Sequence, residues 1–334
     1  MTVSGHTPRQ LRRRWAAFLL ALLAVPALLG LTACAPAEPK LFLTAAEMRT
    51  ALDSLQKDVG SDRVRDLTVW PEGRMTVTVL DSGDATTTNA DWVDGHWTKA
   101  ERSAEASELS KILDRPVWTA PEDLPLDGLE HAIGLAGHPA QLTRLNIFTD
   151  RLGVLTIFLT FNGETMQRSA LLDGSAFVPE LDAGDAADIQ AAVDEIVAEH
   201  GTRATAVSSM NDRVSVDLVV PGMSGEFHVQ RAKTTAPEAV VHATKTPDPA
   251  REFDPRTVDL SQPLKWLDDI AERANVPGTV WDWAIARPPG GGEPMLSYGI
   301  GPDAPSTRVW VKGDGSIAAI DDGKCGDVAG WCAG

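Results

Sequence analysis

The chain has 334 residues, with 47 Asp and Glu against 30 Lys and Arg, which gives a net charge of −17 at pH 7. This acidic excess argues against nucleic acid as a partner and against electrostatic attraction to anionic lipid head groups. Many Ala and Arg residues with few Lys residues indicate a GC-rich genome, such as that of an actinobacterium.

A segment typical of an export signal opens the chain. Arg9 and residues 12–14 make it basic, residues 15–30 are mostly apolar, and no acidic residue precedes Glu38. A basic stretch followed by a short apolar run and small residues marks a secretory signal. The apolar run contains Pro26 and is shorter than the ~20 residues that a membrane-spanning helix needs. We therefore predict a signal peptide over residues 1–33.

The end of this segment, Leu31-Thr32-Ala33-Cys34, resembles the lipobox of bacterial lipoproteins. The resemblance implies that the Cys34 thiol carries acyl chains such as palmitate and that Cys34 becomes the mature N-terminus. Residues 34–43 would then be a lipidated tether at the outer face of the cell membrane. Two acyl chains provide durable anchoring, at ~0.8 kcal/mol per buried CH₂. The alternative is an ordinary signal peptide followed by a chance cysteine.

Two segments, residues 44–60 and 185–201, repeat at an offset of 141 residues. Their apolar residues recur at spacings of three and four, which predicts one buried face of a helix in each copy. Each copy opens with an approximate capping box and ends at a glycine, as helices prefer. The identical residues are Ala45, Ala46, Ala51, Asp53 and Gly60, which recur as Ala186, Ala187, Ala192, Asp194 and Gly201.

A strand with alternating apolar residues follows each predicted helix. Met75, Val77 and Val79 recur as Val214, Val216 and Leu218, now at an offset of 139 residues. Alternation with period two predicts a strand with one face on a core and the other in water.

A second pair of similar segments begins at Pro125 and Pro263, each before further strands and an Asp-Gly-Ser turn at residues 173–175 and 314–316. Another hairpin is predicted to turn at residues 150–153. We therefore predict an α+β fold of two duplicated halves, 44–182 and 183–322, each with two units of one helix and several antiparallel strands. Residues 246–255 are predicted to connect two units, and residues 287–294 to form a hairpin loop.

This order of elements resembles PepSY domains, and tandem units of this kind also resemble the β-lactamase inhibitory protein and small outer-envelope assembly lipoproteins. The likeness covers most of the chain after the signal but is architectural. It implies exported, non-catalytic work: binding, inhibition or help with assembly.

The C-terminal tail, residues 323–334, carries Cys325 and Cys332. In an exported protein, two remaining cysteines most simply form a disulfide, which would pin the tail. The alternative is a Cys-His metal site, although no histidine follows His242.

The sequence contains no pattern that indicates catalysis. It has no G-x-S-x-G motif, and Ser224 lies at a predicted turn. No metal site or cofactor is predicted, because the histidines of the predicted mature chain are scattered among units. They are His96, His131, His138, His200, His228 and His242. With 47 acids, no particular pair of carboxylates stands out.

Tryptophan is unusually frequent, with ten residues against one tyrosine. Trp92 and Trp97 flank a predicted hairpin tip, and Trp281 and Trp283 would share one face of a strand. Exposed aromatic pairs suit a surface that binds sugar or protein, so these four residues are the candidate binding patch. The alternative is that they fill the cores of their own units.

The leading hypothesis is a membrane-anchored lipoprotein that acts as a non-catalytic binding or adaptor module for another envelope protein. The alternative is a carrier of a small lipid or glycan ligand, for which the apolar run at residues 154–161 would form a pocket wall. An envelope hydrolase is the third hypothesis.

Overall fold

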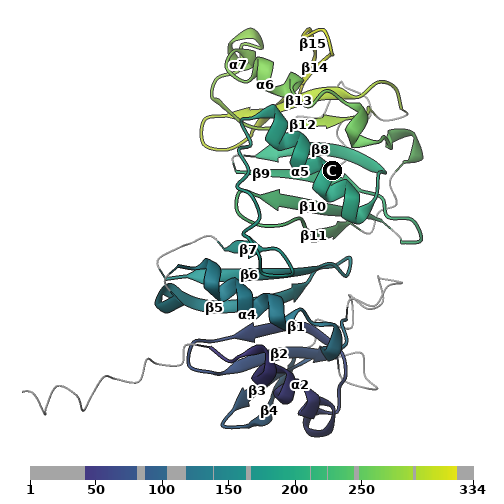
Figure 1. The fold of residues 1–334 in the computed structure, drawn as a ribbon. Helices are drawn as coiled ribbons and strands as arrows, with labels where there is room; N and C mark the ends of the chain where they lie inside the picture. Colours follow the sequence, from purple (N-terminus) through teal and green to yellow (C-terminus); the bar gives the residue numbers. More distant parts are fainter. Residues whose placement is uncertain are drawn as a thin grey trace, which may run out of the picture. The chain divides into compact units, whose positions relative to one another are not determined.

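The computed structural model describes residues 42–80, 87–103, 118–137, 139–162, 167–210, 212–223, 225–243, 248–288 and 291–321. These residues form two antiparallel sheets with a few helices (Figure 1), which confirms the predicted α+β class and the two similar halves. Cys34, Cys325 and Cys332 lie outside the described residues, so lipidation and the disulfide stay predictions.

The first half contains a seven-stranded sheet in the order β4-β3-β2-β1-β5-β6-β7. Its strands are β1 (Val64–Val69), β2 (Met75–Leu80), β3 (Thr87–Val93), β4 (His96–Ser103), β5 (Leu142–Thr149), β6 (Leu155–Phe161) and β7 (Arg168–Ala170). Its helices are α2 (Ala45–Val59) and α4 (Leu126–Leu135), with 3₁₀ turns η1 (Pro121–Asp123) and η2 (Pro139–Gln141).

The second half contains an eight-stranded sheet in the order β11-β10-β9-β8-β12-β13-β14-β15. Its strands are β8 (Ala204–Met210), β9 (Arg213–Leu218), β10 (Glu226–Ala232), β11 (Glu238–Ala243), β12 (Thr279–Ala286), β13 (Met295–Gly301), β14 (Thr307–Val311) and β15 (Ile317–Asp321). Its helices are α5 (Ala186–His200), α6 (Gln262–Trp266) and α7 (Ile270–Arg273), with 3₁₀ turns η3 (Pro249–Arg251) and η4 (Pro255–Thr257).

The two sheets share one topology, in which the first strands of the two units pair at the centre. β1 pairs with β5 in the first half, and β8 pairs with β12 in the second. The strands that follow extend each sheet outward on either side by hairpins.

The repeated helices are α2 and α5, at the predicted offset. Thr44 forms a complete capping box with Glu47, whereas Asp185 caps α5 by accepting from the N–H groups of Ala187 and Asp188. Gly60 ends α2 in the left-handed conformation at φ 83°, which glycine adopts without steric cost.

The second helix differs between the halves. α4 is continuous, whereas its counterpart is broken into α6 and α7. Even so, both pack on the glycine of the Asp-Gly-Ser turn. A Cβ on Gly174 would lie 2.1 Å from the Gly128 carbonyl oxygen, and one on Gly315 would lie 2.6 Å from the Trp266 ring. Gly128 and Trp266 are equivalent residues of the predicted repeat, so this contact is duplicated too.

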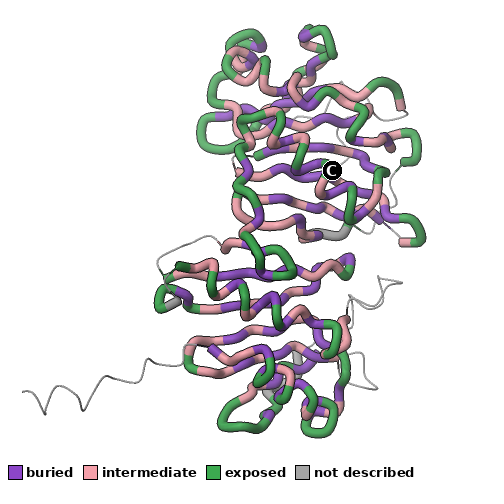
Figure 2. The backbone as a smooth tube through the Cα atoms, in the orientation of Figure 1, coloured by how far each residue is buried: buried purple, intermediate pink, exposed green. Residues whose placement is uncertain are grey.

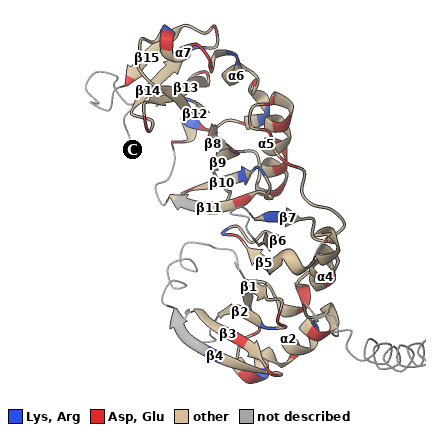
Figure 3. Ribbon diagram, turned by 90° about the vertical axis from the view of Figure 1, so that its left-hand side faces the viewer, with Lys and Arg blue, Asp and Glu red and all other residues tan. Residues whose placement is uncertain are grey.

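One face of each sheet packs against its helices, as α2, α4 and α5 show in Figure 3. Met75, Val77 and Val79 of β2 are completely buried, and the threonines between them are half-buried. Figure 2 shows such buried positions recurring along the strands of both halves. The predicted alternation is confirmed for β2. In β9, Val214 and Val216 are buried as predicted, but Ser215 between them is buried as well.

The predicted turns lie where expected. Residues 150–153 connect β5 with β6, where the Asp150 N–H donates to the Val154 carbonyl at 2.9 Å. Asp94 and Gly95, at φ 53° and 83°, form the tip between β3 and β4. Two central residues with positive φ fit a type I′ hairpin turn.

Candidate functional site

The four tryptophans of the predicted patch do not form an exposed surface. Trp97 is 7% exposed, and its Nε1–H donates to the Ala51 carbonyl of α2 at 2.8 Å. Trp92 packs on Trp97 with ring centroids 5.3 Å apart. This pair fills the space between the β3–β4 hairpin and α2, so its position matches the core alternative.

In β12, a bulge separates the other two tryptophans. The register shifts between Val280 and Asp282, so Trp281 is the extra residue of the strand. Trp283 is 3% exposed and belongs to the core, while the Trp281 Nε1–H donates to the Gly301 carbonyl at 2.9 Å. The expectation of two exposed neighbours on one strand face is therefore not met, because it assumed a regular strand. Both residues border a hollow of about 230 Å³.

A larger pocket, of about 300 Å³, lies where the first half meets α5 and the loop between β10 and β11. Its walls are mostly apolar, and Val154 and Leu155 belong to the run that the sequence singled out as a pocket wall. Leu171 and Leu172 are 45% and 47% exposed although both are large and apolar. The principal apolar residues are Val154, Leu155, Leu171, Leu172, Val178 and Pro237. Glu195 and Glu199, one helical turn apart on α5, also line it.

Backbone hydrogen bonds join the two halves beside this pocket. The Ser169 N–H of β7 donates to the Thr234 carbonyl, and the Leu181 N–H donates to the Lys233 carbonyl, both at 2.8 Å. The Ala236 N–H donates to the Ser169 hydroxyl at 2.9 Å. These three hydrogen bonds therefore hold the β10–β11 loop against Ser169 and Leu181 of the first half.

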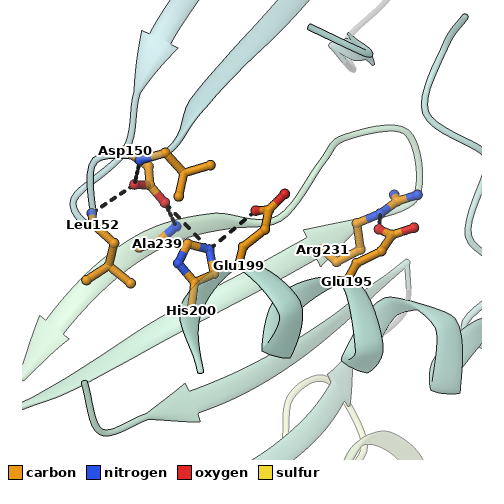
Figure 4. Close-up of polar contacts among 8 residues, drawn as sticks. Asp150, Leu152, Glu195, Glu199, His200, Arg231 and Ala239 are labelled. Carbon is orange, nitrogen blue, oxygen red and sulfur yellow. Dashed lines mark hydrogen bonds and ion pairs between the residues drawn. The ribbon is translucent and has the colours of Figure 1, made fainter. Parts of the chain in front are cut away.

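Arg231 supports the same region from within. Its side chain is buried, and its Nε–H donates to Glu195 at 2.9 Å (Figure 4). A second nitrogen donates to the Pro179 carbonyl at 2.5 Å. The charge of Glu195 is thus balanced by a buried guanidinium group.

Asp150 is the most buried carboxylate at the junction, with no exposed surface. One oxygen accepts from the N–H groups of Leu152 and Val154 at 2.8 and 2.9 Å. The other accepts from the Ala239 N–H of β11 at 2.9 Å (Figure 4). Because buried carboxylates need such donors, Asp150 connects its own turn to the second half.

His200, the last residue of α5, lies between two acids. Its buried Nε2 is 4.0 Å from an Asp150 oxygen and 3.7 Å from a Glu199 oxygen. This nitrogen has no hydrogen-bond partner among the described residues. Burial lowers the pKa of His200 although Asp150 opposes the shift, so the ring is neutral at pH 7.

The carboxylate of Glu199 stands at the wall of the pocket with 43% of its side chain exposed. Partial burial raises its pKa, and the negative charges of Asp150 and Glu195 add to the effect. The pocket thus combines apolar walls with a carboxylate in an unfavourable environment, and a buried imidazole lies behind that carboxylate.

Sequence reasoning missed most of this site. Asp150 was predicted only as a turn residue and His200 only as one of several scattered histidines. The apolar run at residues 154–161 was the one sequence feature that indicated the pocket, and its first three residues line it. In the described part of the chain, no group of three or more His, Cys, Asp and Glu could hold a metal ion.

Comparisons with known proteins do not assign this chain to a family. No family model matches, and no curated protein matches. Proliferating cellular nuclear antigen from Entamoeba histolytica aligns over 78% of this chain and 92% of its own, at 12% identity and a TM-score of 0.13. The PCNA2–PCNA3 complex from Sulfolobus tokodaii aligns over 84% and 97%, at 11% identity and a TM-score of 0.14. Backbones that superpose this poorly support no conclusion about fold or function.

Among the described residues, no helix is long and apolar enough to cross a membrane.

Proposed function

We propose that this protein is a lipid-anchored envelope protein that binds a small, largely apolar ligand in the pocket between its halves. The pocket carries this proposal. Ligand sites are typically concave, about 300–1,000 Å³ in volume, and lined by apolar residues with a few polar groups. The volume of about 300 Å³ and the apolar walls place this pocket at the small end of that range.

The burial of Trp97 and Trp283 favours the carrier over the adaptor for another envelope protein. An exposed tryptophan patch would have favoured the adaptor, but two of the four candidate residues are core residues. The carrier hypothesis depended on a cavity with residues 154–161 in its wall, and Val154, Leu155 and Thr156 line the pocket.

Binding is also better supported than hydrolysis. Neither serine nor cysteine is among the described residues that line the pocket. Asp150 lies 4.0 Å from His200, and its oxygens already accept backbone hydrogen bonds. A catalytic triad needs a nucleophile beside a histidine that a carboxylate orients through a hydrogen bond, and this arrangement supplies neither.

The test replaces both Leu171 and Leu172 with Ser, which removes apolar wall from the pocket at side chains that are already about half exposed. We expect 1-octanol, detected by saturation-transfer NMR, to bind the wild-type protein and to bind the variant about tenfold more weakly, a loss of about 1.4 kcal/mol. Ile320→Ser is the matched control, because Ile320 is 44% exposed and does not line the pocket. Equal binding by all three proteins, or no binding to wild type, would contradict the proposal.

A further inference from the structure

We propose that the ligand carries a positively charged group, such as an ammonium, which Glu199 recognises. This inference rests on the proposed function and specifies the chemistry of the ligand. It is carried by an unbalanced charge at the wall of the pocket.

Glu195 and Asp150, two other acids of the junction, have partners. Arg231 balances Glu195 at 2.9 Å, and Asp150 accepts three backbone N–H groups. The nearest cations on the loop and on β7, Lys233 and Arg168, both face Glu180, at 4.0 and 3.2 Å.

Glu199 has no such partner. Among the described residues, no Lys or Arg nitrogen lies within 4.0 Å of its carboxylate, and its one close polar neighbour is His200. Because burial lowers the pKa of His200, this neighbour is uncharged at pH 7 and leaves the carboxylate unbalanced.

The buried imidazole does not form a hydrogen bond with Glu199. The His200 side chain is 1% exposed, yet its Nε2, directed at the Glu199 carboxylate, has no hydrogen-bond partner among the described residues (Figure 4). Buried polar atoms normally have a partner. Because Nε2 is enclosed and His200 does not line the pocket, an ammonium group in the pocket would reach the Glu199 carboxylate and not the imidazole.

The surroundings make a cation more favourable here than in open water. A carboxylate beside apolar walls and two other acids is poorly stabilised by solvent, and an opposite charge a few ångströms away favours its ionised form. Hydrogen bonds between charged groups are also about twice as strong as neutral ones. An anionic ligand would meet repulsion from Glu199 at the same place.

The volume sets the size of the probe. The pocket of about 300 Å³ equals roughly ten times the ~30 Å³ that one water occupies in the liquid. An eight-carbon chain with one polar group is of this size. Octylamine, 1-octanol and octanoate therefore differ in charge while they match in length.

The experiment measures the dissociation constants of the three probes at pH 7.5 for wild type and for Glu199→Gln. We expect octylamine to bind wild type at least tenfold more tightly than 1-octanol, and octanoate to bind most weakly. In Glu199→Gln the advantage of octylamine should disappear while the affinity for 1-octanol stays within twofold, which also shows that the pocket is intact.

Asp194→Asn is the matched control, because Asp194 is an exposed residue of α5 that does not line the pocket. It removes the same charge from the same helix and should keep the preference for octylamine. An equal loss in both variants would mean a long-range charge effect and would overturn the role of Glu199.

The two proposals fail in different ways. If 1-octanol binds wild type and octylamine binds no more tightly, the cationic ligand is wrong and the pocket stands. If none of the three probes binds, the proposed function itself is wrong.

Discussion

Replacing Asp150 with Asn tests how far one buried carboxylate holds the two halves together. The amide oxygen can keep the bonds from Leu152 and Val154, but the amide nitrogen then faces the Ala239 N–H, and two donors repel. A buried donor without an acceptor costs about 1–3 kcal/mol, and the two remaining bonds lose the strengthening that a charge provides. Removal of a buried charge offsets part of this cost. We expect a net loss of about 2 kcal/mol in the free energy of unfolding.

Equilibrium unfolding in urea at pH 7, followed by two spectroscopic probes, measures this loss. For an m-value of about 3 kcal/mol/M, a loss of about 2 kcal/mol lowers the midpoint by about 0.7 M. Asp314→Asn is the control, because Asp314 is exposed and accepts both bonds from Ser316 on one oxygen, which Asn retains. If the midpoints of the two variants differ from wild type by the same small amount, the connecting role of Asp150 is refuted.

Three further predictions concern stability and location. Burial raises the pKa of Asp66 to about 6, against the opposing effects of Arg65 and Thr78. The folded state therefore holds this proton more tightly than the unfolded state, so stability falls by about 3 kcal/mol as the pH rises from about 4 to 6. Asp66→Asn should flatten this part of the profile in urea titrations, and an unchanged slope would contradict the pKa. Trp97→Ala should lower the free energy of unfolding by about 3–5 kcal/mol, whereas a loss below 1 kcal/mol would show that the ring is not a core residue. Cys34→Ala should move the protein from the membrane to the soluble fraction on cell fractionation; if it stays with the membrane, the lipobox prediction is wrong.

The helices and strands could be predicted from the sequence where they depend on a local pattern of apolar residues. The buried face of α2 depends on Met48, Leu52 and Leu55, whose spacing alone predicts a helix, and β2 depends on strict alternation. Repetition of both patterns in α5 and β9 made the duplication visible without any structure. By contrast, the break between α6 and α7 was not predicted, although the matching segment forms one continuous helix in α4.

The candidate site could not be predicted from the sequence, because it depends on contacts between segments that are distant in the chain. Asp150 and Ala239, which form a hydrogen bond, are 89 residues apart in the sequence, and Arg231 and Glu195 are 36 residues apart. No periodicity in either segment reports on such a contact. The prediction that Trp281 and Trp283 share an exposed strand face failed for a related reason. Alternation assumes a regular strand, and the bulge at Trp281 changes the face of the sheet on which the following residues lie.

The hydrogen bonds of Asp150 also have a kinetic meaning. The bond to Ala239 closes a long loop and can form only when the β5–β6 turn and β11 are both in place, so we expect it to form late in folding. Contacts that are absent from the transition state slow unfolding and leave the folding rate nearly unchanged. If it forms after the transition state, loss of this bond should speed unfolding and leave the folding rate nearly unchanged.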